Sequence, residues 1–170
     1  INTKALDDIA KHGANKGQSP KDVAQKSDVI ITMLPNSPQV KEVVLGEGGL
    51  IEGIKEGKTL IDMSSISPVT SQEVAAKLAE RGVEMLDAPV SGGQEKAQKG
   101  TLAIMVGGKQ EVFDRCKKLL ETMGNTITHM GNIGAGQTTK LVNQVMVAVN
   151  IAAVAEGLVL GKKAGVVPRR

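Results

Sequence analysis

Asp28-Val-Ile-Ile-Thr-Met-Leu-Pro-Asn-Ser-Pro38 is the stretch of sequence that decides the fold. Its run of β-branched and aliphatic side chains is typical of a buried strand, and the first proline ends that strand. Ser37-Pro38 then has the form of a helix start, with a capping side chain before a proline in the first turn. The same rhythm returns at 59–68, so the pattern predicts two successive strand-to-helix units.

Further apolar runs predict strands at 83–88, 101–106 and 127–130, with helices between the strands. Strands that alternate with helices require crossover connections, which favour a mainly parallel sheet. The sequence therefore predicts a doubly wound α/β fold. In such a sheet ligands bind beyond the carboxyl ends of the strands, and that edge carries Pro35, Ser64-Ser65 and residues 89–93.

The composition of the 170 residues excludes several classes of function. Hydrophobic residues make up 41% and charged residues 23%, which is an ordinary globular balance. One Cys and two His argue against a disulfide framework, a zinc site and a catalytic histidine pair. With one Phe, no Trp and no Tyr, the chain has almost nothing on which nucleic acid bases could stack. The net charge of +3 is mild, so we attribute the positive excess to general solubility or to a small anionic ligand, and we expect no nucleic acid partner.

A long helix is expected from Gln137 to Lys163, and within it Val145–Ala155 is apolar except for Asn150. A helix that is apolar all round requires cover on several sides, and no other segment of the sequence is left to provide it. The short apolar run and the polar residues at its ends, Gln144 and Glu156, argue against a membrane span. We therefore expect a second domain or a second subunit to cover this helix.

Two motifs have both a functional and a structural interpretation. Lys140 and Asn143 share one helix face, where a lysine beside an amide can protonate a carbonyl oxygen, although a solvated lysine beside a helix-start asparagine explains the same spacing. Ser91-Gly92-Gly93 follows a strand and either holds a carboxylate on main-chain N–H groups or forms a flexible loop. The spacing alone leaves both alternatives open.

The segment Gly131-Asn-Ile-Gly-Ala-Gly-Gln-Thr138 approaches the phosphate-binding loop pattern, but Gln137 occupies the position of its lysine. Nucleotide hydrolysis is therefore not expected, and these glycines are predicted to form the bend before the long helix. Asp62 and Asp87 lie within apolar strands and are interpreted as structural acids that need hydrogen-bond partners. The dinucleotide fingerprint G-x-G-x-x-G does not follow any predicted strand.

Several stretches, in the same order along the chain, resemble the β-hydroxyacid dehydrogenases, the family of 3-hydroxyisobutyrate dehydrogenase. These stretches are 28–38, 60–66, 86–93, 100–108 and 134–144. The resemblance extends over essentially all of the chain. It implies a Rossmann-like NAD(P)-binding domain at 1–133 whose first strand, glycine-rich turn and second strand would precede Ile1. It also implies that the helix at 134–170 leads into an all-helical domain beyond Arg170.

The resemblance also implies roles for individual residues. The matching positions are Lys140 as general acid/base, Ser91, Gly92, Gly93 and Asn143 as substrate-binding residues, and Met33, Leu34, Pro35 and Ser65 as cofactor contacts. Many members of the family have a second asparagine where this chain has Gln144, which leaves the role of the amide open. The choice between NAD and NADP is made in the segment expected before Ile1, so both cofactors remain possible.

The activity implied by the resemblance is the reversible reduction of a 3-oxo acid, tartronate semialdehyde, to D-glycerate in the cytoplasm. Oxidation of 3-hydroxyisobutyrate would use the same residues and differs only in substrate. A third possibility follows from the missing glycine-rich turn, which normally holds the cofactor's pyrophosphate. In that case the chain is a catalytically inert fragment that acts at most as an assembly module. The expected partners are a small hydroxy acid and further copies of the chain through the long helix, with no nucleic acid and no membrane.

Overall fold

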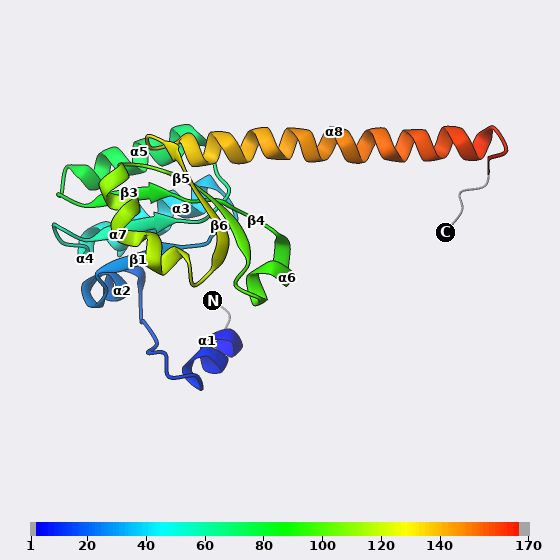
Figure 1. Ribbon diagram of the computed structural model, residues 1–170. Coiled ribbons are helices and arrows are strands. Elements are labelled where there is room, and N and C mark those ends of the chain that lie inside the picture. The colour runs from blue at the N-terminus through cyan, green and yellow to red at the C-terminus, as the bar shows by residue number, and fades with distance from the viewer. Residues whose placement is uncertain (1–2, 167–170) are drawn as a thin grey trace.

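The computed structural model describes residues 3–166, in which eight helices and six strands form an α/β body with one long projecting helix (Figure 1). The first two residues of the predicted NAD(P)-binding domain and the last four of the predicted helical segment lie outside the described residues. The helices are α1 (Thr3–Ala10), α2 (Pro20–Lys26), α3 (Ser37–Leu45), α4 (Leu50–Gly53), α5 (Pro68–Ala79), α6 (Gly93–Gln98), α7 (Gln110–Leu120) and α8 (Ala135–Lys163). The strands are β1 (Val29–Thr32), β2 (Thr59–Asp62), β3 (Glu84–Asp87), β4 (Val90–Ser91), β5 (Leu102–Gly107) and β6 (Gly124–Gly131).

The sheet is mainly parallel, as predicted, but it changes direction at β5. Strands β1, β2 and β3 pair in parallel, and β6 pairs in parallel with β5. Both β3 and β4 run antiparallel to β5, with Asp87 opposite Gly107 and Val90 opposite Ile104. These pairs share one register, so β3 and β4 form a single ladder along one edge of β5. The sequence pattern did not reveal this reversal, which the chain makes through the short helix α6.

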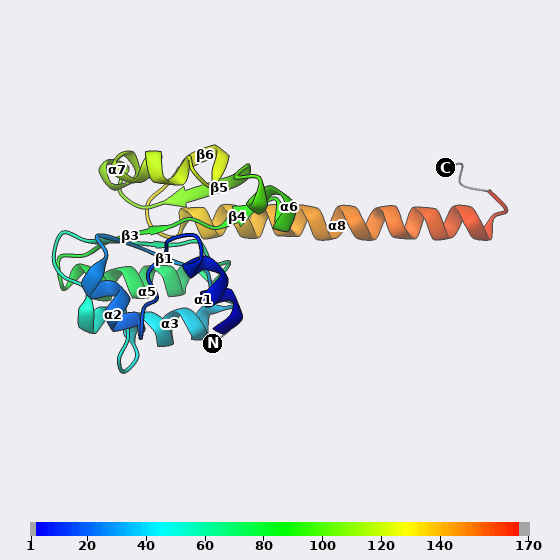
Figure 2. The same cartoon turned by 90° about the horizontal axis from the view of Figure 1, so that it is seen from below.

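Helices cover the sheet on both faces, which is the arrangement of a doubly wound fold (Figure 2). Leu60 of β2 and Met85 of β3 point into a core that includes side chains from α2, α3 and α5. Their neighbours Ile61 and Leu86 point to the other face, into a core that includes side chains of α7. Strands buried on both faces explain the continuous apolar runs that identified them in the sequence.

The sequence predicted a buried strand over 28–34, and that prediction is wrong for one face of β1 (Val29–Thr32). Ile30 is buried and Thr32 is nearly so, but the side chains of Val29 and Ile31 remain 36% and 40% exposed. Strand β1 lies at the edge of the sheet, which is where these two side chains stay partly exposed. The short elements α4, β4 and α6 were also not predicted, because each is too short to show a periodic pattern.

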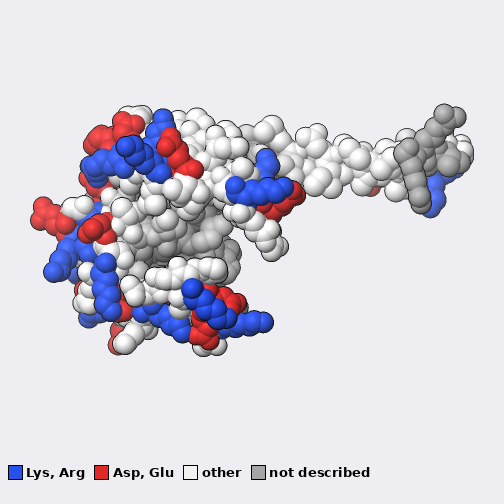
Figure 3. Space-filling view, turned by 60° about the horizontal axis from the view of Figure 1, so that its bottom comes forward, with Lys and Arg blue, Asp and Glu red and all other residues white. Residues whose placement is uncertain are grey.

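Helix α8 is buried only at its first turn, at Gly136 and Gln137, and then projects away from the body (Figure 3). Leu141, Val149 and Leu158 are among its many exposed apolar side chains, which confirms that the helix leaves an uncovered apolar surface within the described part of the chain. Its 29 residues include a window of mean hydropathy 1.7, so length and composition alone would let it cross a bilayer. The sequence argument against a membrane span is wrong on that point, although core helices of soluble proteins meet the same criteria.

The Asp87 carboxylate anchors the start of α8 at the end of β3. Its Oδ1 accepts a hydrogen bond from the main-chain N–H of Gly134 at 2.7 Å, and its Oδ2 accepts one from the N–H of Gln137 at 2.7 Å. The first N–H groups of a helix lack partners inside the helix and carry the positive end of its dipole. The buried acid therefore satisfies two of these donors and sets the direction in which α8 leaves the sheet.

Two glycines allow α8 to approach the strands this closely. A Cβ atom on Gly136 would overlap the main-chain oxygens of Met105 and Asp87, and one on Gly107 would overlap the Asp87 carboxylate. Gly134, which caps the helix, has a φ of +91°, a conformation that other residues rarely adopt. The glycines thus form the bend before the helix, as predicted.

Replacement of Gly136 by alanine should destabilise the chain, because main-chain atoms of two strands would have to move to make room for a methyl group. We expect Gly136→Ala to lower the free energy of unfolding by more than about 2 kcal/mol in urea denaturation. Gly157→Ala is the matched control in the same helix, since a Cβ there meets nothing within 4 Å. The control should be neutral or should gain up to about 1 kcal/mol from helix propensity. Equal effects of the two variants would contradict the close contact at Gly136.

The stability of the fold should depend on pH through Asp87. Burial raises the pKa of this carboxyl from 3.8 to about 6, against the two N–H donors that favour its ionised form. Between these two pKa values the folded chain keeps a proton on Asp87 that the unfolded chain has already lost. The protonated acid therefore contributes stability at low pH, and this contribution is lost as the pH rises through 6. Relative to Asp87→Asn, the wild type should lose on the order of 2–3 kcal/mol of unfolding free energy between about pH 4 and 7. A constant difference across this range in urea denaturation would refute the assignment.

Candidate active site

The turns that follow β1 and β2 are tied together by a buried acid, Asp62. Its Oδ1 accepts hydrogen bonds from Thr32 Oγ1 at 2.8 Å and from Ser64 Oγ at 2.6 Å. Ser64 Oγ in turn accepts the main-chain N–H of Leu34 at 2.9 Å. This network confirms that Asp62 is a structural acid with hydrogen-bond partners. It also holds the Met33–Pro35 turn beside the Ser64–Ser65 turn at the carboxyl edge of the sheet.

Burial raises the pKa of Asp62, and its hydrogen bonds to Ser64 and Thr32 act in the opposite direction. Within residues 3–166 its second oxygen, Oδ2, has no hydrogen-bond partner. The side chain is fully buried, so it supports the two turns from below and does not itself reach the surface of the site.

A second tie runs from α8 to the turn after β2 through Gln137, whose side chain is 1% exposed. Its Oε1 accepts the main-chain N–H of Ile66 at 3.0 Å, and its Nε2 donates to the main-chain oxygen of Ser64 at 2.7 Å. The sequence analysis noted Gln137 only as a departure from a phosphate loop. The available signal was the position of Gln137, whose long amide side chain stands among glycines and threonines at the start of a helix. Such a side chain can be buried there and can bridge two elements.

Lys140 lies one turn after Gln137 and lines a cavity of about 370 Å³ together with Ser65. The other lining residues come from the start of α3, the start of α5 and α8 itself: Asn36, Ser37, Ile66, Ser67, Pro68, Gln137, Leu141 and Gln144. Burial lowers the pKa of the Lys140 ammonium, and this group makes no ion pair with any residue between 3 and 166. The cavity therefore presents one proton donor among hydroxyl and amide groups.

The predicted substrate-binding segment lies on a different element. Ser91 ends β4 and is half-buried, and the exposed Gly92 and Gly93 have φ values of +137° and +65°. These φ values favour glycine at both positions, and the segment forms the turn that starts α6. In both ribbon views α6 and α8 leave the sheet on the same side. None of these three residues lines the cavity of Lys140.

The remaining predicted residues are distributed around this edge. Asn143 is half-buried and its Nδ2 donates to Gln144 Oε1 at 3.3 Å, and it is Gln144 that lines the cavity. Met33 is 64% exposed and Pro35 is exposed, whereas Leu34 is half-buried and held by Ser64. The structure therefore brings Lys140 and Ser65 into one cavity, with the Met33–Pro35 turn fixed beside Ser65.

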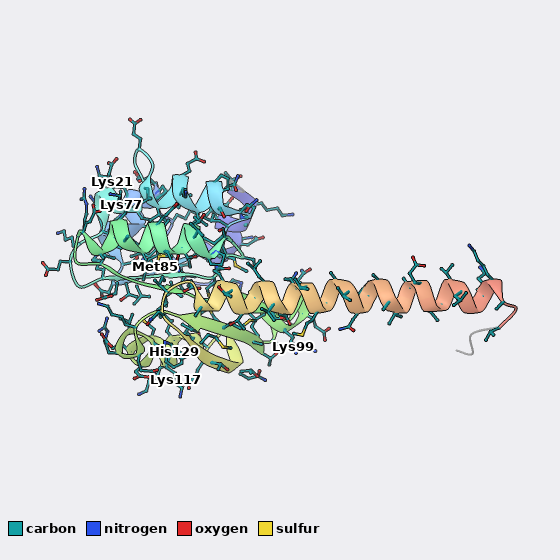
Figure 4. All side chains as sticks on the ribbon, turned by 90° about the horizontal axis from the view of Figure 1, so that it is seen from above. Lys21, Lys77, Met85, Lys99, Lys117 and His129 are labelled. Atoms are coloured by element: carbon teal, nitrogen blue, oxygen red, sulfur yellow. The ribbon has the colours of Figure 1, made fainter. Side chains whose placement is uncertain are left out.

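Other candidate groups lie elsewhere. A second cavity, of about 430 Å³, is lined by Gln72, Met85 and Lys109 among others, and none of the predicted site residues lines it. Figure 4 labels Met85, which comes from β3 beside α5. His129 bonds the main-chain oxygen of Gly108, and Cys116 is buried in the core. No group of three or more His, Cys, Asp or Glu residues within 3–166 is arranged to hold a metal ion.

Two protein-family models match this chain, one over the α/β body and one over the long helix. Residues 1–131 match the model of the NAD binding domain of 6-phosphogluconate dehydrogenase. Residues 134–170 match the model of the NAD-binding segment of NADP-dependent 3-hydroxyisobutyrate dehydrogenase. The boundary between the two matches falls at the bend before α8.

Individual relatives agree with these matches. The chain is 47% identical over 164 residues to 2-hydroxy-3-oxopropionate reductase of Escherichia coli K12, covering 96% of this chain and 56% of that protein. It is 40% identical over 157 residues to mitochondrial 3-hydroxyisobutyrate dehydrogenase of Mus musculus, covering 92% of this chain and 47% of that protein. The chain thus spans about half the length of the curated relatives it matches.

A solved structure shows the same arrangement of elements. The 3-hydroxyisobutyrate dehydrogenase of Mycobacterium tuberculosis, solved with L-serine, superimposes with a TM-score of 0.91 at 36% identity, covering 98% of this chain and 56% of that chain. Together with the match over 1–131, these relatives show that the chain belongs to the β-hydroxyacid dehydrogenase family, which includes 3-hydroxyisobutyrate dehydrogenase.

Proposed function

We propose that this chain is part of an NAD(P)-dependent oxidoreductase that reduces tartronate semialdehyde (2-hydroxy-3-oxopropanoate) to D-glycerate. The observation that carries the proposal is Lys140, a half-buried ammonium without an ion pair among residues 3–166, in one cavity with Ser65. The substrate is suggested by the 47% identity to 2-hydroxy-3-oxopropionate reductase. The 40% identity to a mouse 3-hydroxyisobutyrate dehydrogenase supports the alternative, oxidation of 3-hydroxyisobutyrate, at the same site.

The chain's own residues would hold the substrate and deliver one proton. Ser91 and the turn at Gly92–Gly93 would bind the substrate carboxylate, and Asn143 would fix the orientation of the substrate. When bound, the reduced nicotinamide supplies a hydride to the aldehyde carbon. Lys140 Nζ then donates its proton to the carbonyl oxygen, so that the C=O bond becomes a CH–OH group. In the reverse direction the neutral amine accepts the hydroxyl proton, which its lowered pKa favours.

The residues present fit the nicotinamide half of NAD or NADP. The Met33–Pro35 turn and Ser65 lie at the carboxyl edge of parallel strands, where dinucleotides bind in folds of this type. The 170-residue sequence has no G-x-G-x-x-G turn after a strand to hold the pyrophosphate. This absence supports the alternative that the 170 residues alone are catalytically inert, and the activity is therefore proposed for the complete gene product.

The proposal also assigns the two parts of the chain to different domains of the protein. Residues 1–133 would form the part of the NAD(P)-binding domain that is present, and 134–170 the helix that leads away from it. The exposed apolar side chains of α8 support assembly of the protein through this helix as a homo-oligomer. The proposal includes no membrane and no nucleic acid partner. A cytoplasmic location is consistent with a chain whose single thiol, Cys116, is buried and unpaired.

The proposed activity is tested with the complete gene product, tartronate semialdehyde, and NADH or NADPH. We expect reduction with at least one of the two cofactors, and kcat/KM higher than for 3-hydroxyisobutyrate with the oxidised cofactor. If the complete gene product binds neither cofactor at millimolar concentration, the proposed oxidoreductase activity is refuted. A higher kcat/KM for 3-hydroxyisobutyrate would make that compound the substrate in place of tartronate semialdehyde.

The same assay tests the role of Lys140. General acid catalysis contributes roughly 10²–10⁴-fold, so Lys140→Met should lower kcat by that factor while the fold is retained. Lys162→Met is the matched control, because this lysine lies near the far end of the same helix. Wild-type turnover in Lys140→Met, or an equal loss in the control, would remove Lys140 from the reaction.

A further inference from the structure

Gln137 is a buried polar side chain to which the proposed reaction assigns no role. Its amide oxygen and its amide nitrogen each make a hydrogen bond, and it lies one helical turn before Lys140. We propose that Gln137 is a positioning residue that holds Ser65 against Lys140, and so fixes the gap in which cofactor and substrate would meet. This inference rests on the proposed function of that site.

The first step of the argument is the pair of main-chain groups that Gln137 binds. Its Oε1 accepts the N–H of Ile66, and its Nε2 donates to the carbonyl oxygen of Ser64. These two groups flank Ser65 on both sides, so the amide clamps the backbone of that residue. The Ser65 side chain itself stays exposed and lines the cavity of Lys140.

The second step is the rigid connection from Gln137 to Lys140. The two residues are three positions apart in α8 and therefore lie on the same face of the helix. The main-chain N–H of Gln137 also binds Asp87 Oδ2 at 2.7 Å, which fixes the residue to the end of β3. One residue thus joins the turn after β2, the end of β3 and the helix that carries the proton donor.

The third step is the chemistry of the side chain. At neutral pH the glutamine amide offers one acceptor and one donor to the two main-chain groups. Methionine fills a similar volume but leaves the Ile66 N–H and the Ser64 oxygen unpaired. A glutamate carboxylate keeps the acceptor and loses the donor, whereas a protonated glutamic acid regains both. The clamp of Gln137→Glu should therefore depend on pH, and that of the wild type should not.

The experiment compares wild type, Gln137→Met, Gln137→Glu and a control, Val112→Ala. Val112 is a residue of α7 that is buried in the core on the opposite face of the sheet. Its truncation to alanine should lower the stability of the fold without changing the contacts of the turn at Ser65. The first readout is hydrogen exchange of the Ile66 amide in the 170-residue chain, expressed relative to wild type at the same pH. The second readout uses the complete gene product: we measure the KM for NADH or NADPH and kcat separately, and compare each with its wild-type value.

We expect Gln137→Met to accelerate exchange at Ile66 at least tenfold and to raise the cofactor KM at least tenfold. Val112→Ala should change neither readout by more than about twofold. Near pH 8 the carboxylate of Gln137→Glu would still accept the Ile66 N–H but would repel the Ser64 oxygen, so its cofactor KM should exceed that of the wild type. Near pH 5 the protonated acid should restore both bonds and a KM close to that of the wild type.

Exchange at Ile66 in Gln137→Met equal to that in the control would overturn the proposal, as would accelerated exchange with an unchanged KM in an active enzyme. If the wild type binds neither cofactor, the proposed function fails separately. Faster exchange in Gln137→Met and not in the control would then still support the clamp, and unchanged exchange would still overturn it.

Discussion

The structure depends on the buried carboxylate of Asp87 at the amino end of α8. Two main-chain N–H groups of the helix start bind its two oxygens, and glycines at 107 and 136 let helix and strands come close enough for this contact. A buried charge is costly unless it is well bonded, and the helix start offers donors that otherwise lack partners. The contact therefore fixes where α8 begins, and with it the position of Lys140.

A second acid, Asp62, performs the corresponding task for the turns after β1 and β2. It binds Thr32 and Ser64, and Ser64 binds Leu34, so both turns are fixed from within the sheet. Gln137 then connects this network to the helix held by Asp87. The groups proposed to contact cofactor and substrate thus stand on buried polar supports, which is what a site needs if a proton donor is to face a bound carbonyl group accurately.

The sequence predicted the fold well because β2 and β3 are buried on both faces and because glycines and prolines mark the helix ends. It could not show the reversal at β5, since a buried strand has the same apolar pattern in either direction. The family resemblance predicted Lys140 and Ser65 as site residues, and the structure places both in one cavity. The hydrogen bonds of Gln137 are to Ser64 and Ile66, more than seventy residues away, and no local pattern reveals such a partner. The roles of Ser91–Gly93 and Asn143 remain predictions.

Direct titration of the Lys140 ammonium by NMR tests the central claim, that the anchored start of α8 places this group in a partly buried position beside a cavity. The account predicts a pKa below the ordinary value of 10.5, because burial disfavours the charged form. It also predicts that this pKa changes when D-glycerate and the oxidised cofactor are added together to the complete gene product. An ordinary pKa that neither ligand alters would contradict the account, since it would describe a lysine that faces water and takes no part in a site.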